Sequence, residues 1–278
     1  MMPALASEGY LLRNRPLPYV LGAAWTAMVV GFAFVVPYAI YLALDPATNP
    51  DRGGLLQIVL PGEVHRTALG SYPMFGGAVM LILGALVTGS EDRWGTWKVR
   101  FTQGPSRSSV MTAKFVAAGL AACLMALVAL LGAIAASLLI ATLAGASLSL
   151  PTIPALLTSL GAATLIAVAW TSVGMALGVI FKGATVAIAV GLIWTLALEN
   201  LLSGLAGILP ALEPVRALLL STASGSLVGS TGAPLQGAGG TPGVVDHLSA
   251  GQSVVVLVGY TVAALAISNW LMLRRDIT

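Results

Sequence analysis

The chain has 278 residues, of which 58% are hydrophobic and only 8% are charged. Soluble domains carry roughly 25% charged residues, so thirteen basic and ten acidic side chains are too few to coat a soluble protein of this length. The net charge of +3 excludes the dense basic surface typical of nucleic-acid binding, and the single cysteine, Cys123, excludes an intramolecular disulfide framework. The composition predicts an integral membrane protein.

The first predicted element is an interfacial helix over residues 1–18. This segment places Leu5, Leu11 and Leu12 among polar residues such as Glu8, a composition suited to a helix that lies in the membrane surface. A frayed terminus is the alternative.

Six apolar runs follow, each long enough for a membrane helix, which needs about 20 residues. They are predicted at Tyr19–Leu44, Leu69–Gly89, Phe115–Leu143, Ile153–Phe181, Ala184–Leu209 and Gln252–Leu273. The first run follows two arginines, as a signal peptide would, but it is longer than a signal peptide and no clear cleavage site follows it. We therefore expect an all-α polytopic membrane protein in which residues 1–278 form a single transmembrane domain.

The basic residues predict the orientation of these spans. Lys and Arg in short loops stay on the cytoplasmic side. With the N-terminus inside, ten of the thirteen basic residues are cytoplasmic, and only Arg52, Arg66 and Arg216 lie outside. Both termini are therefore expected in the cytoplasm, and the chain in a bacterial plasma membrane.

The fourth and fifth spans and the segment after them carry three further features. The fourth span contains Gly174 and Gly178 at the spacing that lets helix backbones approach closely. We expect this pair to pack within one chain rather than to form a dimer seam. Glu199 and Asn200, late in the fifth span, are a candidate intramembrane polar site or the point where the helix leaves the hydrocarbon. Residues 203–251 are rich in Gly, Ser and Pro, so short re-entrant helices followed by a loop are expected there.

The densest polar segment is the predicted cytoplasmic loop Ser90–Lys114, SEDRWGTWKVRFTQGPSRSSVMTAK. At helical spacing, Trp94, Trp97 and Phe101 share one side of a short helix, Arg93 and Arg100 project from an adjoining side, and Gly104-Pro105 ends the helix. Three interpretations are open for this loop. It is a positive-inside anchor, a site for anionic lipid headgroups, or the surface on which a soluble partner acts.

The order of residues in this loop resembles that of the ABC-2 type transporter permeases. A span ends in Glu91, then come Gly95-Thr96, an aromatic and basic stretch, Pro105 with Arg107, and finally Lys114, which opens the next span. Trp94 stands before Gly95, where the family more commonly has an arginine. The resemblance extends to an N-terminal interfacial helix with a glutamate like Glu8, six spans, and short re-entrant helices between the fifth and sixth spans.

The resemblance implies that residues 91–107 form the coupling helix or loop that docks on an ATPase subunit. The implied coupling residues are Glu91, Arg93, Trp94, Gly95, Thr96, Trp97, Arg100, Phe101, Pro105, Arg107 and Lys114. The sequence contains no Gly-x-x-x-x-Gly-Lys-Ser/Thr motif, so ATP and magnesium are expected on two copies of a separate P-loop ATPase. No catalytic, cofactor-binding or metal-binding residue is expected in this chain.

The implied function is export of an amphipathic or hydrophobic substrate, such as a drug, an antimicrobial peptide or a lipid, by a permease homodimer. The main alternative is an ion-coupled secondary transporter or channel, in which Glu199 would be the relay. An intramembrane enzyme is disfavoured: His65 lacks a His-Glu-x-x-His motif, Ser224 lacks a complete Gly-x-Ser-Gly element, and both residues, like His247, are expected in outer loops.

Overall fold

The computed structural model describes residues 2–93, 95–97, 106–237 and 240–275, and every regular element in this part of the chain is a helix. Six helices are long and apolar enough to cross a membrane: Pro16–Ala43, Pro61–Asp92, Arg107–Leu143, Ile153–Ile180, Ala184–Ala206 and Ala250–Arg274. The chain is thus an all-helical, multi-pass membrane protein, as predicted.

Two of the spans begin eight residues earlier than expected. The second begins at Pro61 rather than Leu69, and the third begins at Arg107 rather than Phe115. Apolar composition marks only the part of a helix that suits hydrocarbon, whereas the helix itself continues until a cap or a turn ends it. At the third span the cap is Ser106, whose side chain accepts a hydrogen bond from the backbone N–H of Ser109.

Three of the spans are uninterrupted α-helices, namely α8 (Arg107–Leu143), α9 (Ile153–Ile180) and α14 (Ala250–Arg274). The other three contain a π-helical turn. The first span consists of α2 (Pro16–Val30), η1 (Gly31–Val35) and α3 (Val36–Ala43). The second consists of η3 (Pro61–Glu63), α5 (Val64–Ser71), η4 (Tyr72–Gly76) and α6 (Gly77–Arg93), and the fifth of α10 (Ala184–Ile193), η5 (Trp194–Leu198) and α11 (Glu199–Ala206).

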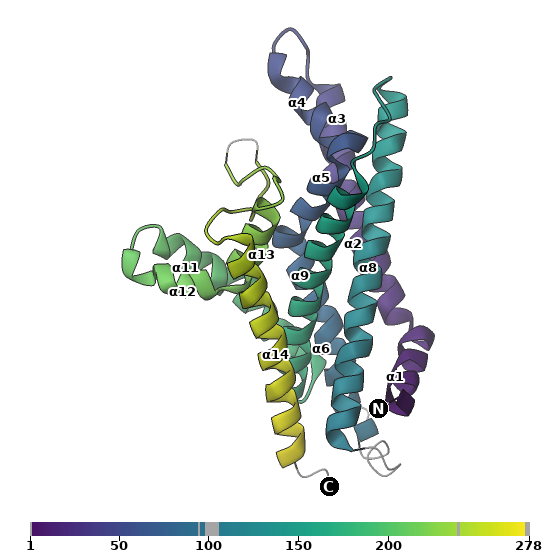
Figure 1. Cartoon of the computed structure of the whole chain (residues 1–278), viewed down its shortest axis with the longest axis vertical. Coiled ribbons are helices and arrows are strands. Elements are labelled where there is room, and N and C mark those ends of the chain that lie inside the picture. The colour runs from purple at the N-terminus through teal and green to yellow at the C-terminus, as the bar shows by residue number, and fades with distance from the viewer. Residues whose placement is uncertain (1, 94, 98–105, 238–239, 276–278) are drawn as a thin grey trace.

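The remaining helices are short and lie outside the six spans: α1 (Met2–Asn14), η2 (Pro50–Arg52), α4 (Gly53–Val59), η6 (Pro210–Leu212), α12 (Glu213–Leu218) and α13 (Leu220–Gly229). The predicted N-terminal helix corresponds to α1, which packs beside the first part of α8. Both termini lie at the same end of the bundle, as an even number of crossings requires (Figure 1). We call this the N/C end.

The second and fourth spans are packed so closely that side chains are excluded between them. A Cβ atom added to Gly174 would lie 2.1 Å from the Leu81 carbonyl oxygen, and one added to Gly84 would lie 1.9 Å from the Thr171 carbonyl oxygen. The Thr88 hydroxyl donates a hydrogen bond across this seam to the Met175 carbonyl at 2.9 Å. The glycines of the fourth span therefore serve packing within the chain.

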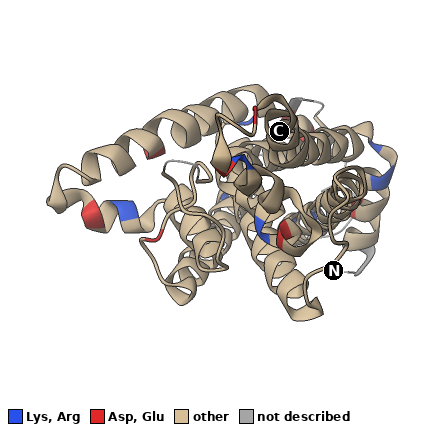
Figure 2. Ribbon diagram, turned by 90° about the horizontal axis from the view of Figure 1, so that it is seen from above, with Lys and Arg blue, Asp and Glu red and all other residues tan. Residues whose placement is uncertain are grey.

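The last helix of the fifth span, α11, and the short helix α12 that follows it form a hairpin that extends sideways from the bundle (Figures 1 and 2). Prolines at positions 210 and 214 limit the length of its helices. Figure 2 also shows how sparse the charged positions are along the ribbon.

Two predictions of loop structure were wrong. Ser224 lies inside α13 and is wholly buried, and its hydroxyl accepts a hydrogen bond from Trp170 Nε1 and donates one to the Leu220 carbonyl. His65 lies on α5, within the second span, and is 8% exposed. Both were assigned to loops because polar residues interrupt the apolar pattern there. A helix buries a residue such as Ser224 readily when a hydrogen-bond partner is within reach. His65 is buried although its Nδ1 atom has no hydrogen-bond partner among the described residues.

Candidate coupling site at the N/C end

Lys114 is the centre of a buried ion cluster at the N/C end. It lies in the second turn of α8 and is 1% exposed. Its Nζ atom is 2.8 Å from Glu8 Oε2 on α1 and 3.2 Å from Glu91 Oε1 on α6. Both carboxylates are also buried. One ammonium group thus connects three helices, of which α1 is far from the other two in sequence.

Arg15, just before α2, brings a second positive charge to the cluster. Its NH2 atom is 3.4 Å from Glu91 Oε1, and its NH1 atom donates to the Ser90 hydroxyl at 3.5 Å. Among the described residues, two carboxylates and two cations thus lie within one group. Such balance matters because a buried charge without a partner costs several kcal/mol.

The chain that follows Glu91 folds back onto the same carboxylate. Gly95 has a φ angle of +62°, a conformation that glycine adopts without strain, and it reverses the chain after α6. The Thr96 hydroxyl then donates to Glu91 Oε2 and to the Glu91 carbonyl oxygen. Trp97 is 3% exposed, and Lys114 Nζ lies 5.6 Å from the centroid of its ring. The start of the loop is therefore fixed to the cluster.

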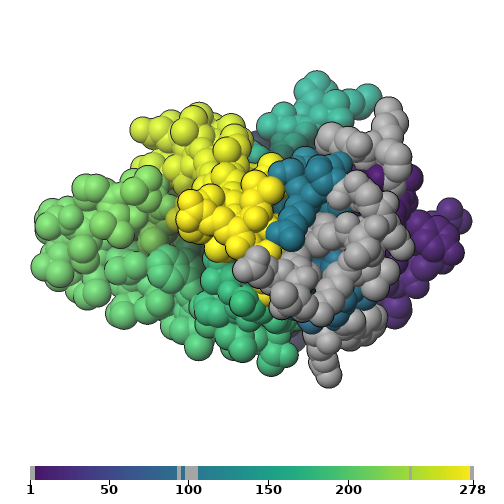
Figure 3. Space-filling view, turned by 90° about the horizontal axis from the view of Figure 1, so that it is seen from below, coloured from purple at the N-terminus to yellow at the C-terminus, as the bar shows by residue number. Residues whose placement is uncertain are grey.

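A second group of contacts ties the last span to the same end. Arg107 NH1 donates to the carbonyl oxygens of Met272 at 3.0 Å and Arg275 at 2.7 Å. Arg275 NH2 pairs with Asp92 Oδ1 at 2.9 Å. The C-terminal end of α14 accordingly lies next to the start of α8, with α1 at the edge of this face (Figure 3).

The structure brings together most of the predicted coupling residues that it describes. Glu91, Gly95, Thr96, Trp97 and Lys114 belong to the cluster, and Arg107 belongs to the neighbouring contacts with α14. The predicted residues Trp94, Arg100, Phe101 and Pro105 and the Arg93 side chain lie outside the described residues, as does most of the predicted amphipathic helix.

Sequence reasoning missed Arg15, Asp92 and Arg275 as members of this site, and it noted Glu8 only as a residue of the N-terminal helix that the family shares. Each is a charged residue at the end of an apolar helix, where a role at the membrane surface explains it equally well. Only the three-dimensional structure identifies these residues as part of the site, because each pairs with a residue on a different helix.

The predicted polar site of Glu199 and Asn200 is divided in the structure, because the two side chains lie in different environments. Glu199 is wholly buried, and its carboxylate accepts hydrogen bonds from Trp194 Nε1 at 2.9 Å, Ser221 N at 2.8 Å and Leu220 N at 3.3 Å. It thereby fastens the fifth span to the start of α13. Asn200 is exposed and donates to the Leu196 carbonyl at 3.0 Å.

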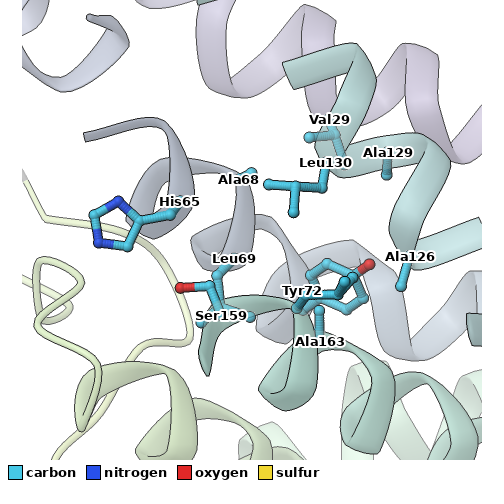
Figure 4. A pocket seen from close by; sticks show the side chains of 11 residues that line it. Val29, His65, Ala68, Leu69, Tyr72, Ala126, Ala129, Leu130, Ser159 and Ala163 are labelled. Carbon is cyan, nitrogen blue, oxygen red and sulfur yellow. The ribbon is translucent and has the colours of Figure 1, made fainter. Parts of the chain in front are cut away.

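Two cavities lie away from the N/C end. The smaller one, of about 10 Å³, is lined by apolar side chains together with His65, Tyr72 and Ser159 (Figure 4). This is room for one water molecule at most, so it is no substrate site. The larger one, of about 840 Å³, lies between the bundle and the segment that includes α11, α12 and α13. Among the described residues, no group of three or more His, Cys, Asp or Glu side chains could hold a metal ion.

The chain matches a known protein family. A family model described as "Protein of unknown function (DUF2705)" matches residues 26–278, which is nearly the whole chain. No curated protein matches it.

Proposed function

The chain belongs to the DUF2705 family of proteins of unknown function, and we propose that it is the membrane permease subunit of an ABC-2 type exporter. A permease dimer works with two copies of a separate P-loop ATPase, which binds ATP and magnesium. The N/C end faces the cytoplasm, and the helices between the fifth and sixth spans re-enter the membrane from outside. The substrate is amphipathic or hydrophobic, in the class of drugs, antimicrobial peptides and lipids.

The observation that carries this proposal is the buried cluster around Lys114. Three residues of the motif that resembles ABC-2 permeases, Glu91, Thr96 and Lys114, contact one another there although 23 positions separate the first from the last. A loop that served only as a positively charged anchor would need none of these buried contacts, because its charges could remain in water. The cluster instead supports a loop with a fixed orientation relative to the spans.

Such a connection suits the transmission of force. Closure of two ATPase subunits would push on residues 91–107, and the cluster would pass that movement to α1, α6 and α8 as a rigid body. The glycine seam between α6 and α9 extends the rigid unit to the fourth span, because close-packed helices shift together.

The loop also has the charge expected of a docking surface. Residues 93–107 contain four basic and no acidic residues. An ATPase surface that presents acidic side chains would be attracted to this segment and oriented by it.

One observation favours an alternative function, that of an ion-coupled transporter. Glu199 is a fully buried carboxylate in the fifth span, as a proton relay in an ion-coupled transporter would be. In that alternative, Glu199→Gln abolishes efflux of a fluorescent amphiphile from inverted vesicles, and efflux follows the proton gradient. In the permease proposal, efflux requires ATP, and Glu199→Gln only weakens the attachment of α13.

Affinity purification from the native membrane in mild detergent tests the proposal. The tagged chain should recover a P-loop ATPase in a one-to-one ratio. Reversing the loop charges (Arg93→Glu, Lys98→Glu and Arg100→Glu together) should abolish that recovery. Arg13→Glu is the matched control, since Arg13 is an exposed basic residue at the same end, on α1. Recovery of the chain alone, with efflux that follows a proton gradient, would refute the permease proposal.

A further inference from the structure

The cavity of about 840 Å³ has an apolar side built from membrane spans. Met28 on the first span, Phe75 and Val79 on the second, and Trp170 on the fourth line this side. The volume lies within the range of pockets that bury a drug-sized ligand, about 300–1,000 Å³. An apolar ligand body would therefore be enclosed at the level of the membrane spans.

The cavity is open to the outer surface of the bundle. Met74 and Leu196 line it and are 45% and 57% exposed, respectively. They belong to η4 and η5, the two π-helical turns of the second and fifth spans. Such turns often mark functional sites, and here both present side chains to the same cavity. A ligand dissolved in the bilayer could enter between them without crossing water.

The opposite side of the cavity is polar and carries a positive charge. Arg216, Gln236 and His247 line it, and Arg216 is the only formally charged side chain among the described lining residues. Partial burial, and then the positive charge of Arg216, lowers the pKa of His247, which favours the neutral form of this histidine. The charge in the cavity at neutral pH is thus that of Arg216.

The guanidinium group of Arg216 is only partly satisfied by its neighbours. Its Nε atom is buried and has no hydrogen-bond partner among the described residues. One of its terminal nitrogens contacts His247 Nε2, and the other lies 3.7 Å from Glu213, whose side chain is 53% exposed and does not line the cavity. This ion pair is long and its glutamate is largely exposed, so it neutralises only part of the guanidinium charge. The geometry of the fork favours a carboxylate, sulfate or phosphate oxygen pair.

We propose that this cavity binds an amphiphile with an anionic headgroup, whose head pairs with Arg216 and whose apolar body lies against Met28, Phe75 and Trp170. The suggestion that this amphiphile is the exported substrate rests on the proposed function. The suggestion that the cavity binds it does not, because binding is measurable on the chain without any ATPase. A cationic amphiphile is disfavoured, since no acidic side chain among the described residues lines the cavity to receive it.

The test is a titration of the full chain in phosphatidylcholine nanodiscs with two probes, a dansyl-labelled fatty acid and its neutral methyl ester. Empty nanodiscs correct for partition into lipid. The acid should bind about tenfold more tightly than the ester, the effect of about one charge-assisted contact. Arg216→Gln should remove that preference, whereas Arg216→Lys should keep most of it.

Two further variants complete the design. Arg66→Gln is the matched control, because Arg66 is also paired with a glutamate three positions earlier, Glu63, but does not line the cavity. It should bind both probes as the wild type does. Val79→Trp should fill the apolar side of the cavity and weaken the binding of both probes equally.

Three outcomes would overturn the proposal: equal affinity for acid and ester in the wild type, an unchanged preference in Arg216→Gln, or unchanged binding in Val79→Trp. Circular dichroism of each variant confirms that it is folded. If the acid binds as expected but affinity purification recovers no ATPase, the exporter proposal fails and the binding site stands.

Discussion

Lys114 is buried where an unpaired ammonium group would be strongly unfavourable, and carboxylates from two other helices neutralise it. One of them, Glu8, lies 106 positions away in the sequence. The free energy of a buried ion pair is asymmetric. Forming it gains little over apolar packing, whereas removing one partner leaves the others charged and unpaired. The cluster therefore specifies how the helices meet more than it adds to stability.

This asymmetry predicts a large effect of Lys114→Met. The variant keeps the length of the side chain but leaves Glu8 and Glu91 with Arg15 as the remaining cation of the cluster. We expect a loss of about 3–5 kcal/mol in the free energy of unfolding, measured by titration with sodium dodecyl sulfate in mixed micelles. Lys182→Met, at an exposed turn between α9 and α10, should change it by less than about 0.5 kcal/mol.

Combining Lys114→Met with Glu8→Gln checks that the effect belongs to the pair. The second substitution removes one of the stranded charges, so the double variant should be more stable than the sum of the single effects predicts, by about 0.5–3 kcal/mol. Additive effects would contradict a direct interaction between Lys114 and Glu8.

Among the helices, the seam between α6 and α9 is the feature that gives the loop a rigid base. Gly84, Gly174 and Gly178 let the two backbones touch, and Thr88 donates a hydrogen bond across the contact. Because Glu91 lies near the end of α6, a movement of the loop is passed to both helices.

Gly174→Ala tests this seam. The new Cβ atom would overlap the Leu81 carbonyl oxygen, so the helices would have to separate, at a cost of about 1–3 kcal/mol in unfolding free energy. Gly161→Ala is a control on the same helix α9, since nothing lies within 4 Å of its Cβ position. That control should leave stability unchanged or raise it by up to about 1 kcal/mol. Equal effects of the two variants would show that the seam is not close-packed.

The six spans could be predicted because a run of about 20 apolar residues has few other stable locations than a bilayer. The π-helical turns and the sideways hairpin of α11 and α12 could not, since they depend on how helices pack rather than on composition. Ser224 and His65 illustrate the limit. Both residues are polar and were assigned to loops, but the tertiary structure buries them in helices.

The site was predictable to the extent that it is local in sequence. Glu91, Thr96 and Lys114 were identified together from one motif, and the structure brings them into contact. Arg15 and Arg275 belong to other ends of the chain, and only the folded bundle brings them to Glu91 and Asp92. The sequence also gives no indication that Arg216 and Trp170 line one cavity.

At the scale of the whole molecule, the two proposed sites lie in different parts of the bundle. The buried cluster joins α1, α6 and α8 at the N/C end, while the large cavity lies between the spans and the segment that includes α11, α12 and α13. The spans α6 and α9 connect them, since α6 carries both Glu91 and Val79, and α9 carries Trp170. A force applied to the loop would therefore act on helices that line the cavity.

The central claim is that residues 91–107 dock on a partner ATPase, and site-specific photocrosslinking in native membranes tests it most directly. A benzophenone amino acid is placed at position 100, in the loop, or at position 147, in the exposed connection between α8 and α9 at the opposite end of the bundle. We predict a covalent adduct with a P-loop ATPase from position 100 and none from position 147. The absence of an ATPase adduct at position 100, or the same adduct from both positions, would contradict the account.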